Sequence, residues 1–138
     1  MAALTKARLT AERHGQTAQL AVNAATIIYQ GAMVGLSGAG AGAVAKPASA
    51  DVTLRIIGVA ERTADNRVAL PAPVMVDLRR GVFLMINDAA DPLTIGDLGL
   101  PCYASDDQTV AKTSATNTKP QAGTVAFIDN QGVWVRFI

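Results

Sequence analysis

Reactive side chains are scarce in this sequence of 138 residues, which has one cysteine, one histidine and one tryptophan. Cys102 has no partner for an intramolecular disulfide, which fits a reducing compartment. A structural zinc site takes four Cys or His ligands, and nucleophilic catalysis needs a base held on a rigid scaffold, whereas His14 lies near the N-terminus. We therefore expect no enzymatic activity, no cofactor and no metal site.

Paired acidic residues do not change this expectation. Asp88 with Asp91, and Asp106 with Asp107, provide carboxylates for a cation. Neither pair lies in a loop of the DxDxDG type, which brings several oxygen ligands to one calcium ion. Aspartate at a turn commonly accepts hydrogen bonds from the local backbone. We therefore interpret both pairs as turn residues.

Net charge is nearly balanced, since twelve basic and eleven acidic side chains leave +1. A protein that neutralises many phosphates carries a basic excess, so nucleic acid is not an expected partner. The longest uncharged stretch, residues 15–45, contains Gln and Asn and then becomes rich in Gly and Ala, so it does not resemble a membrane span. The N-terminal residues lack the apolar run of a secretory signal. We expect a soluble protein made in the cytoplasm, without a membrane partner.

Half of the residues are hydrophobic, and they occur in short runs separated by turn residues. No segment has a sustained helical period. The clearest element is a C-terminal hairpin, in which residues 124–128 and 133–138 flank the turn residues Asp129-Asn130-Gln131-Gly132. The pattern predicts an all-β fold, a small β-barrel or β-sandwich, with one short helical turn over Ile95–Leu98. A chain of this length forms one domain, which we place at residues 16–138.

Three internal segments have informative patterns. In residues 74–79, apolar residues alternate with Met75, Asp77 and Arg79, which predicts a half-buried strand. Residues 82–86 (VFLMI) are continuously apolar, which predicts burial on both faces or a bulge that changes the register. The Gly- and Ala-rich residues 35–45 do not have the spacing of a nucleotide-binding loop, so we expect a flexible hairpin tip or loop between two short strands.

The first fifteen residues contain three basic side chains, Lys6, Arg8 and Arg13, against one acidic side chain, Glu12. No apolar stripe in this segment would hold a helix to a core. We therefore interpret residues 1–15 as an extended N-terminal arm, which is either a frayed end or a segment that orders against a partner.

Further charged and aromatic residues are candidates for contacts with other subunits. Arg79 and Arg80 form a second basic site, whereas residues 82–111 contain five aspartates and no Lys or Arg. This distribution is either ordinary solvated surface or a set of complementary patches that meet between subunits. Trp134 alternates with valines on the last predicted strand, so it belongs to the core or to a subunit contact. The candidate contact residues are Lys6, Arg8, Arg13, Arg79, Arg80 and Trp134.

A series of segments from about Ile57 to the C-terminus has a recognisable order. It runs GVAERTADN, VDLRRGVF, NDAADPLTIGDLGLPCYASDDQTVAKT, KPQAGTV and GVWVRF, with weaker support from IYQGAMVGL. This order resembles the small head decoration, or capsid cement, proteins of tailed bacteriophages. The most specific piece is ADPLTIGDLGLPCYASDDQTVAKT, which combines a Pro-started helical turn, a Gly-Pro stop and an Asp-Asp turn.

The resemblance implies a β-tulip-like domain that forms homotrimers at three-fold and quasi-three-fold positions on the outside of an icosahedral shell. There it would clamp neighbouring major capsid protein subunits, in part through an N-terminal arm. The leading hypothesis is therefore a non-enzymatic structural protein of the capsid surface. The alternatives are another virion component, such as a head–tail connector or tail protein, and a small β-barrel ligand-binding module or enzyme, which a deep pocket with convergent polar groups would favour.

Overall fold

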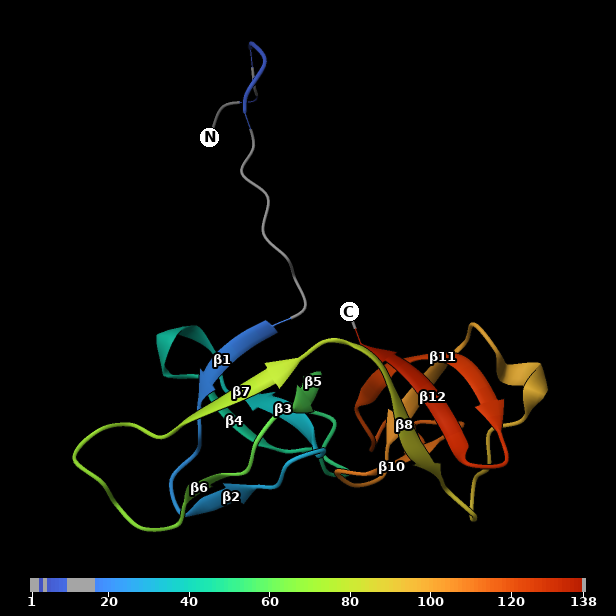
Figure 1. Cartoon of the computed structure of the whole chain (residues 1–138). Coiled ribbons are helices and arrows are strands. Elements are labelled where there is room, and N and C mark those ends of the chain that lie inside the picture. Colours follow the sequence, from blue (N-terminus) through green and yellow to red (C-terminus); the bar gives the residue numbers. More distant parts are fainter. Residues whose placement is uncertain (1–2, 4, 10–16, 138) are drawn as a thin grey trace.

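The computed structural model describes residues 3, 5–9 and 17–137, and the described chain forms two β lobes side by side (Figure 1). The all-β fold predicted from the sequence is confirmed. The N-terminal lobe contains β1 (Thr17–Ala21), β2 (Thr26–Ile28), β3 (Met33–Ser37), a 3-10 turn (Gly40–Gly42), β4 (Val44–Pro47), β5 (Arg55–Ala60), β6 (Ala64–Asn66) and β7 (Met75–Arg79). The C-terminal lobe contains β8 (Gly81–Asn87), a second 3-10 turn (Ile95–Asp97), β9 (Pro101–Ala104), β10 (Thr109–Ala111), β11 (Gln121–Asp129) and β12 (Gly132–Phe137).

The N-terminal lobe is a curved sheet with the strand order β1-β7-β5-β3-β4. Its two edge strands approach each other where Val22, just after β1, forms a parallel bridge with Ala45 of β4. A separate ribbon of β2 and β6 completes the lobe. Residues 61–66 (ERTADN) have the composition of a polar loop, yet Ala64–Asn66 form a strand. Antiparallel pairing with Thr26–Ile28 provides the hydrogen bonds that make this polar segment a strand.

The C-terminal lobe is a closed five-stranded barrel with the order β10-β8-β12-β11-β9, which the β9–β10 pair closes. We call it the barrel. Most neighbouring strands are antiparallel, but β10 runs parallel to β8. Closure removes free sheet edges, which otherwise invite pairing with other chains. The barrel core is filled by aliphatic side chains such as Val110, Val125, Val133 and Val135, all of which are buried.

Side chains from the N-terminal lobe complete the barrel core. Met33 of β3, Val59 of β5 and Ala48 belong to the same buried cluster as the barrel valines. A backbone hydrogen bond from Met33 N to the Asp107 carbonyl oxygen (2.8 Å) also joins the lobes. The lobes therefore pack against each other directly, in addition to the chain connection between β7 and β8.

Several local predictions are confirmed. The Gly- and Ala-rich loop connects the antiparallel strands β3 and β4, as expected for a hairpin tip. The predicted helical turn is a 3-10 turn over Ile95–Asp97, in which the buried Asp97 carboxylate accepts a hydrogen bond from Thr94 N (2.7 Å). In β7, Val76 and Leu78 are buried while Met75 and Arg79 are exposed, which is the half-buried pattern predicted for this segment.

Two predictions about the barrel strands are wrong. Residues 82–86 are neither buried on both faces nor bulged, because Val82, Leu84 and Ile86 are exposed and β8 pairs with β12 in an unbroken register. The predicted C-terminal hairpin is formed by β11 and β12, but its loop is shorter than expected, since Asp129 and Gly132 pair with each other and leave only Asn130 and Gln131 as the loop. Within the described part of the chain, no helix has the length and apolar character required to cross a bilayer.

Candidate interaction surfaces

The outer side of the barrel has a continuous group of exposed apolar side chains. They come from β8, β12 and β11, which are adjacent in the barrel. Leu84 pairs with Trp134, and Trp134 pairs with Phe127 on its other side, so these three side chains form a row across the strands. The exposed fractions are 51% for Phe127 and 51% for Ile86. We call the following residues the barrel face: Val82, Leu84, Ile86, Phe127 and Trp134.

Strand alternation explains why these residues point outward. On β8 and β12, Met85 and Val133 pair with each other and are buried in the barrel core. Their neighbours Leu84 and Trp134 therefore point to the opposite side, where Leu84 is exposed and Trp134 is partly buried. Trp134 is not a core residue, so of the two roles expected from the sequence the structure excludes the core role. Large contiguous apolar patches on a soluble protein mark binding surfaces.

Trp134 is held in place by the end of its own hairpin. Its indole Nε1–H donates to Asp129 Oδ2 at 2.9 Å, and the Gln131 backbone N–H donates to Asp129 Oδ1 at 2.8 Å. These two hydrogen bonds, that of Trp134 first, lower the pKa of Asp129 below its ordinary value. With its N–H satisfied, the indole presents its apolar ring to the barrel face.

Protonation of Asp129 should weaken its hydrogen bond with the Trp134 indole, and the lowered pKa of Asp129 places this event below the pH at which an ordinary aspartate titrates. Because the folded-state pKa of Asp129 is lowered, its stabilising effect is present above the unfolded pKa of about 3.9 and is lost as pH falls through the folded pKa. Trp134 is the single tryptophan, so its fluorescence reports this event. We expect an emission change with a midpoint below about pH 3.9. Asp129→Asn should remove that change, and a midpoint above about 4 would contradict the assignment.

The two other predicted basic contacts lie at the junction of the lobes. Arg79 is the last residue of β7, and its Nε lies 3.2 Å from Glu61 Oε1 in a solvated ion pair. Such pairs contribute little to stability, about 0–1 kcal/mol. Arg80 connects β7 to β8 and is half-buried, and its buried Nε has no hydrogen-bond partner within the described residues. Neither residue belongs to the barrel face.

The N-terminal arm is only partly described. Lys6 and Arg8 are exposed, as are all the described residues of this segment, and Leu9 is 98% exposed. Arg13 and His14 lie outside the described residues. In Figure 1 the described arm residues are separate from both lobes. The described arm residues are thus a second exposed element besides the barrel face, with the apolar Leu9 and the basic Lys6 and Arg8.

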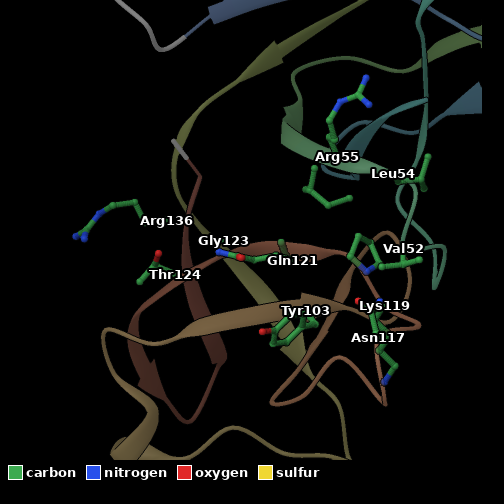
Figure 2. Close-up of a pocket in the computed structure, with 13 residues that line it drawn as sticks. Val52, Leu54, Arg55, Tyr103, Asn117, Lys119, Gln121, Gly123, Thr124 and Arg136 are labelled. Carbon is green, nitrogen blue, oxygen red and sulfur yellow. The ribbon is translucent and has the colours of Figure 1, made fainter. Parts of the chain in front are cut away.

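A groove lies between the lobes and has a volume of about 520 Å³ (Figure 2). One wall comes from the start of β5 in the N-terminal lobe, and the other comes from β9, β11 and β12 of the barrel. Figure 2 shows Arg55 and Arg136 on opposite sides of it, with the Arg136 guanidinium directed away from its centre. Other polar side chains that line it are Tyr103, Asn117, Gln121 and Thr124.

This groove bears on the alternative of a ligand-binding module. Its volume is in the range of small-molecule sites, but such sites are lined mainly by apolar and aromatic side chains. Here Tyr103 is the single aromatic residue of the lining, and β11 contributes the polar side chains of Gln121 and Thr124. The lining is therefore better suited to a polar, charged partner than to an apolar metabolite.

The residues considered for metal or thiol chemistry have structural roles. Asp88 and Asp106 each accept a hydrogen bond from a backbone N–H two residues later (2.9 Å in both cases), as expected for turn residues. No group of three or more potential metal ligands occurs among residues 3, 5–9 and 17–137. Cys102 is completely buried in the barrel core, and burial raises the pKa of its thiol to about 11. Its thiol is therefore protonated at neutral pH and shielded from reagents.

Sequence reasoning located Trp134 but missed the other four residues of the barrel face. The continuous run VFLMI suggested double burial, and only the period of two within it places Val82, Leu84 and Ile86 on one side. It also missed the groove, because Arg55, Tyr103 and Arg136 are far apart in the sequence and show no shared motif.

Comparison of this chain with protein-family models, curated proteins and solved structures found no match. The case for a function therefore depends on the sequence segments and the surfaces described above.

Proposed function

We propose that this chain is a structural virion protein that binds the outside of an icosahedral phage capsid as a homotrimer. In this role it stabilises contacts between neighbouring major capsid protein subunits. The proposal is supported by the order of sequence segments from about Ile57 onward, which resembles capsid cement proteins, and by the surfaces of the folded chain. It places the protein on the virion surface after synthesis in the host cytoplasm.

The barrel face is the observation that carries the proposal. Five large apolar side chains lie together on the outer side of a folded barrel, of which four are exposed and Trp134 is partly buried. Exposing such a patch to water is unfavourable, by about 25 cal/mol for each Å² of apolar surface that a partner would otherwise cover. A protein that works by contact rather than by chemistry needs this kind of surface, and a specific interface of this type covers about 1,000 Å² or more.

The energetic basis of such a role is linkage. A protein that binds the assembled shell and not its separated subunits stabilises the shell by RT ln(1 + [L]/Kd), where [L] is its free concentration. At about one hundred times Kd this amounts to roughly 2.7 kcal/mol for each site. Many identical sites on one shell add these contributions, so modest individual affinities are sufficient.

Electron microscopy of phage shells incubated with the purified protein tests the proposal directly. We expect added density at the three-fold and quasi-three-fold positions, and a sedimentation mass of three chains for the free or bound protein. Rings with more than three subunits would instead favour a head–tail connector or tail protein. Shells without added density at saturating protein would contradict a capsid-binding role.

Removal of residues 1–15 is expected to weaken shell binding by at least about tenfold, because the arm adds a tethered second contact to that of the folded domain. The basic residues Lys6, Arg8 and Arg13 would then contact acidic surface on the shell. Co-sedimentation with shells measures the effect, and a triple Lys/Arg→Gln variant of these residues separates charge from length. If the truncated protein decorates shells as well as the full chain does, the arm is not a binding element.

A further inference from the structure

The start of β5 has an unpaired side next to the groove between the lobes. On its β3 side, β5 is paired at Arg55, Ile56, Gly58 and Val59, and a register shift leaves Ile57 without a ladder partner. On its other side, the ladder with β7 includes only Val59 and Ala60. Arg55 and Ile56 therefore have a ladder partner on one side only, and both residues line the groove. A strand edge of this kind offers alternating N–H donors and C=O acceptors to an added strand.

The charges of the groove favour a negatively charged occupant. Its lining contains Arg55, Lys119 and Arg136 and no Asp or Glu. Lys119 is partly neutralised, because its Nζ lies 3.5 Å from Asp88 Oδ2. Arg55 Nη2 donates to the Gly38 carbonyl oxygen at 2.6 Å, which orients the guanidinium and leaves its charge in place. No carboxylate within the described part of the chain forms an ion pair with Arg136.

The position of Arg136 connects the groove to the barrel face. Arg136 pairs with Val82 of the barrel face on one side and with Thr124 of the groove lining on the other. A partner that covers the barrel face therefore reaches the mouth of the groove without crossing intervening structure. The basic arm of a second copy of this chain does not fit, since Lys6, Arg8 and Arg13 would approach cations of the same sign.

We propose that the groove binds an extended acidic segment of the partner protein, which adds as a strand beside Arg55–Ile57. Backbone hydrogen bonds to the β5 edge would hold the segment, and the exposed Arg136 side chain would turn toward its carboxylates, while Arg55, which is bonded to the Gly38 carbonyl, would add positive charge at the edge of the groove. The polar side chains of Tyr103 and Gln121, which are register partners on β9 and β11, supply further hydrogen-bond groups. That the partner is a capsid subunit rests on the proposed function, whereas the chemistry of the occupant follows from the groove.

Binding of model peptides to the isolated full chain tests this proposal without shells. The probe is a fluorescein-labelled peptide of about eight residues, a typical strand length, with alternating Val and Glu. We expect saturable binding by fluorescence anisotropy, and at least about tenfold weaker binding of a Val/Lys peptide or of the Val/Glu peptide with a central proline, which cannot donate to a ladder. Equal binding of the Val/Lys or proline peptide would overturn the proposal. Equal binding of a single-stranded oligonucleotide would overturn it too, because the site would then recognise anions in general.

Variants of the chain assign the binding to the groove. Arg55→Glu and Arg136→Gln should each weaken binding of the Val/Glu peptide, the charge reversal by at least about tenfold. Arg62→Glu is the matched control, because Arg62 is exposed and does not line the groove. Urea unfolding of each variant identifies any loss of folding. Unchanged peptide affinity in both groove variants overturns the proposal even if shells are still decorated, whereas undecorated shells with intact peptide binding contradict only the capsid role.

Discussion

Replacement of Gly132 by alanine is expected to lower the free energy of unfolding by roughly 2–5 kcal/mol. Gly132 begins β12 with φ near +146°, a backbone conformation that residues with a side chain rarely adopt. A Cβ at this position would lie 2.5 Å from the Met85 carbonyl oxygen, a backbone atom that cannot move without disturbing β8. Backbone strain and steric overlap therefore both contribute to the expected loss of unfolding free energy. Since small domains are stable by only about 5–15 kcal/mol, this one methyl group removes a large share of the total.

Gly42→Ala is the matched control for this substitution. No atom lies within 4 Å of a Cβ built on Gly42, and its φ is not in the left-handed region. We expect its unfolding free energy to stay within about 0.5 kcal/mol of the unmodified chain. Urea denaturation followed by tryptophan fluorescence measures both variants. Equal stability of the two alanine variants would show that the close contact at Gly132 is relieved by a small backbone shift.

In the proposed role on the capsid, Leu84→Glu is expected to abolish self-association and shell binding at concentrations at which the unmodified chain would be fully bound. Leu84 is central in the barrel face, beside Trp134 of β12. A carboxylate at the centre of an apolar interface loses its hydration without gaining a partner, at a cost of several kcal/mol, which corresponds to at least about a hundredfold weaker binding. The folded chain should tolerate the change, because Leu84 is 38% exposed and points away from the barrel core.

Leu70→Glu provides the comparison, since it makes the same chemical change at an exposed residue outside the barrel face. Leu70 is 59% exposed in the loop between β6 and β7 of the N-terminal lobe. Sedimentation velocity gives the oligomeric state, and circular dichroism confirms the fold of both variants. If Leu84→Glu still assembles as the unmodified chain does, the barrel face is not the subunit contact. If Leu70→Glu alone dissociates, the contact lies on the N-terminal lobe.

The sequence was informative where one side of a strand faces the core and the other faces water. Residues 74–79 alternate in polarity, and the structure buries Val76 and Leu78 as that alternation predicts. The same reasoning failed for residues 82–86, because a strand with an apolar exposed face and a strand buried on both faces have the same continuous run of apolar residues. Whether the outer side of β8 is covered by another element of the same chain is a property of the topology, which local patterns do not encode.

The groove was beyond sequence reasoning for a related reason. Its walls are assembled from β5 and from strands of the barrel, so its lining is defined only when the two lobes pack. Even the unpaired side of β5 depends on how far β7 follows it, which the structure limits to two residue pairs. Composition favoured a protein of contacts rather than of chemistry, but only the folded chain shows which strands carry the exposed apolar side chains.

The insertion of Met33 and Val59 into the barrel core has a consequence for the way this chain denatures. A fragment that starts at Gly81 would retain all five barrel strands but would lack the Met33 and Val59 side chains of the buried core. We therefore expect heat or denaturant to melt both lobes in a single cooperative transition. A load applied at either end of the molecule is in this way resisted by the stability of the whole chain.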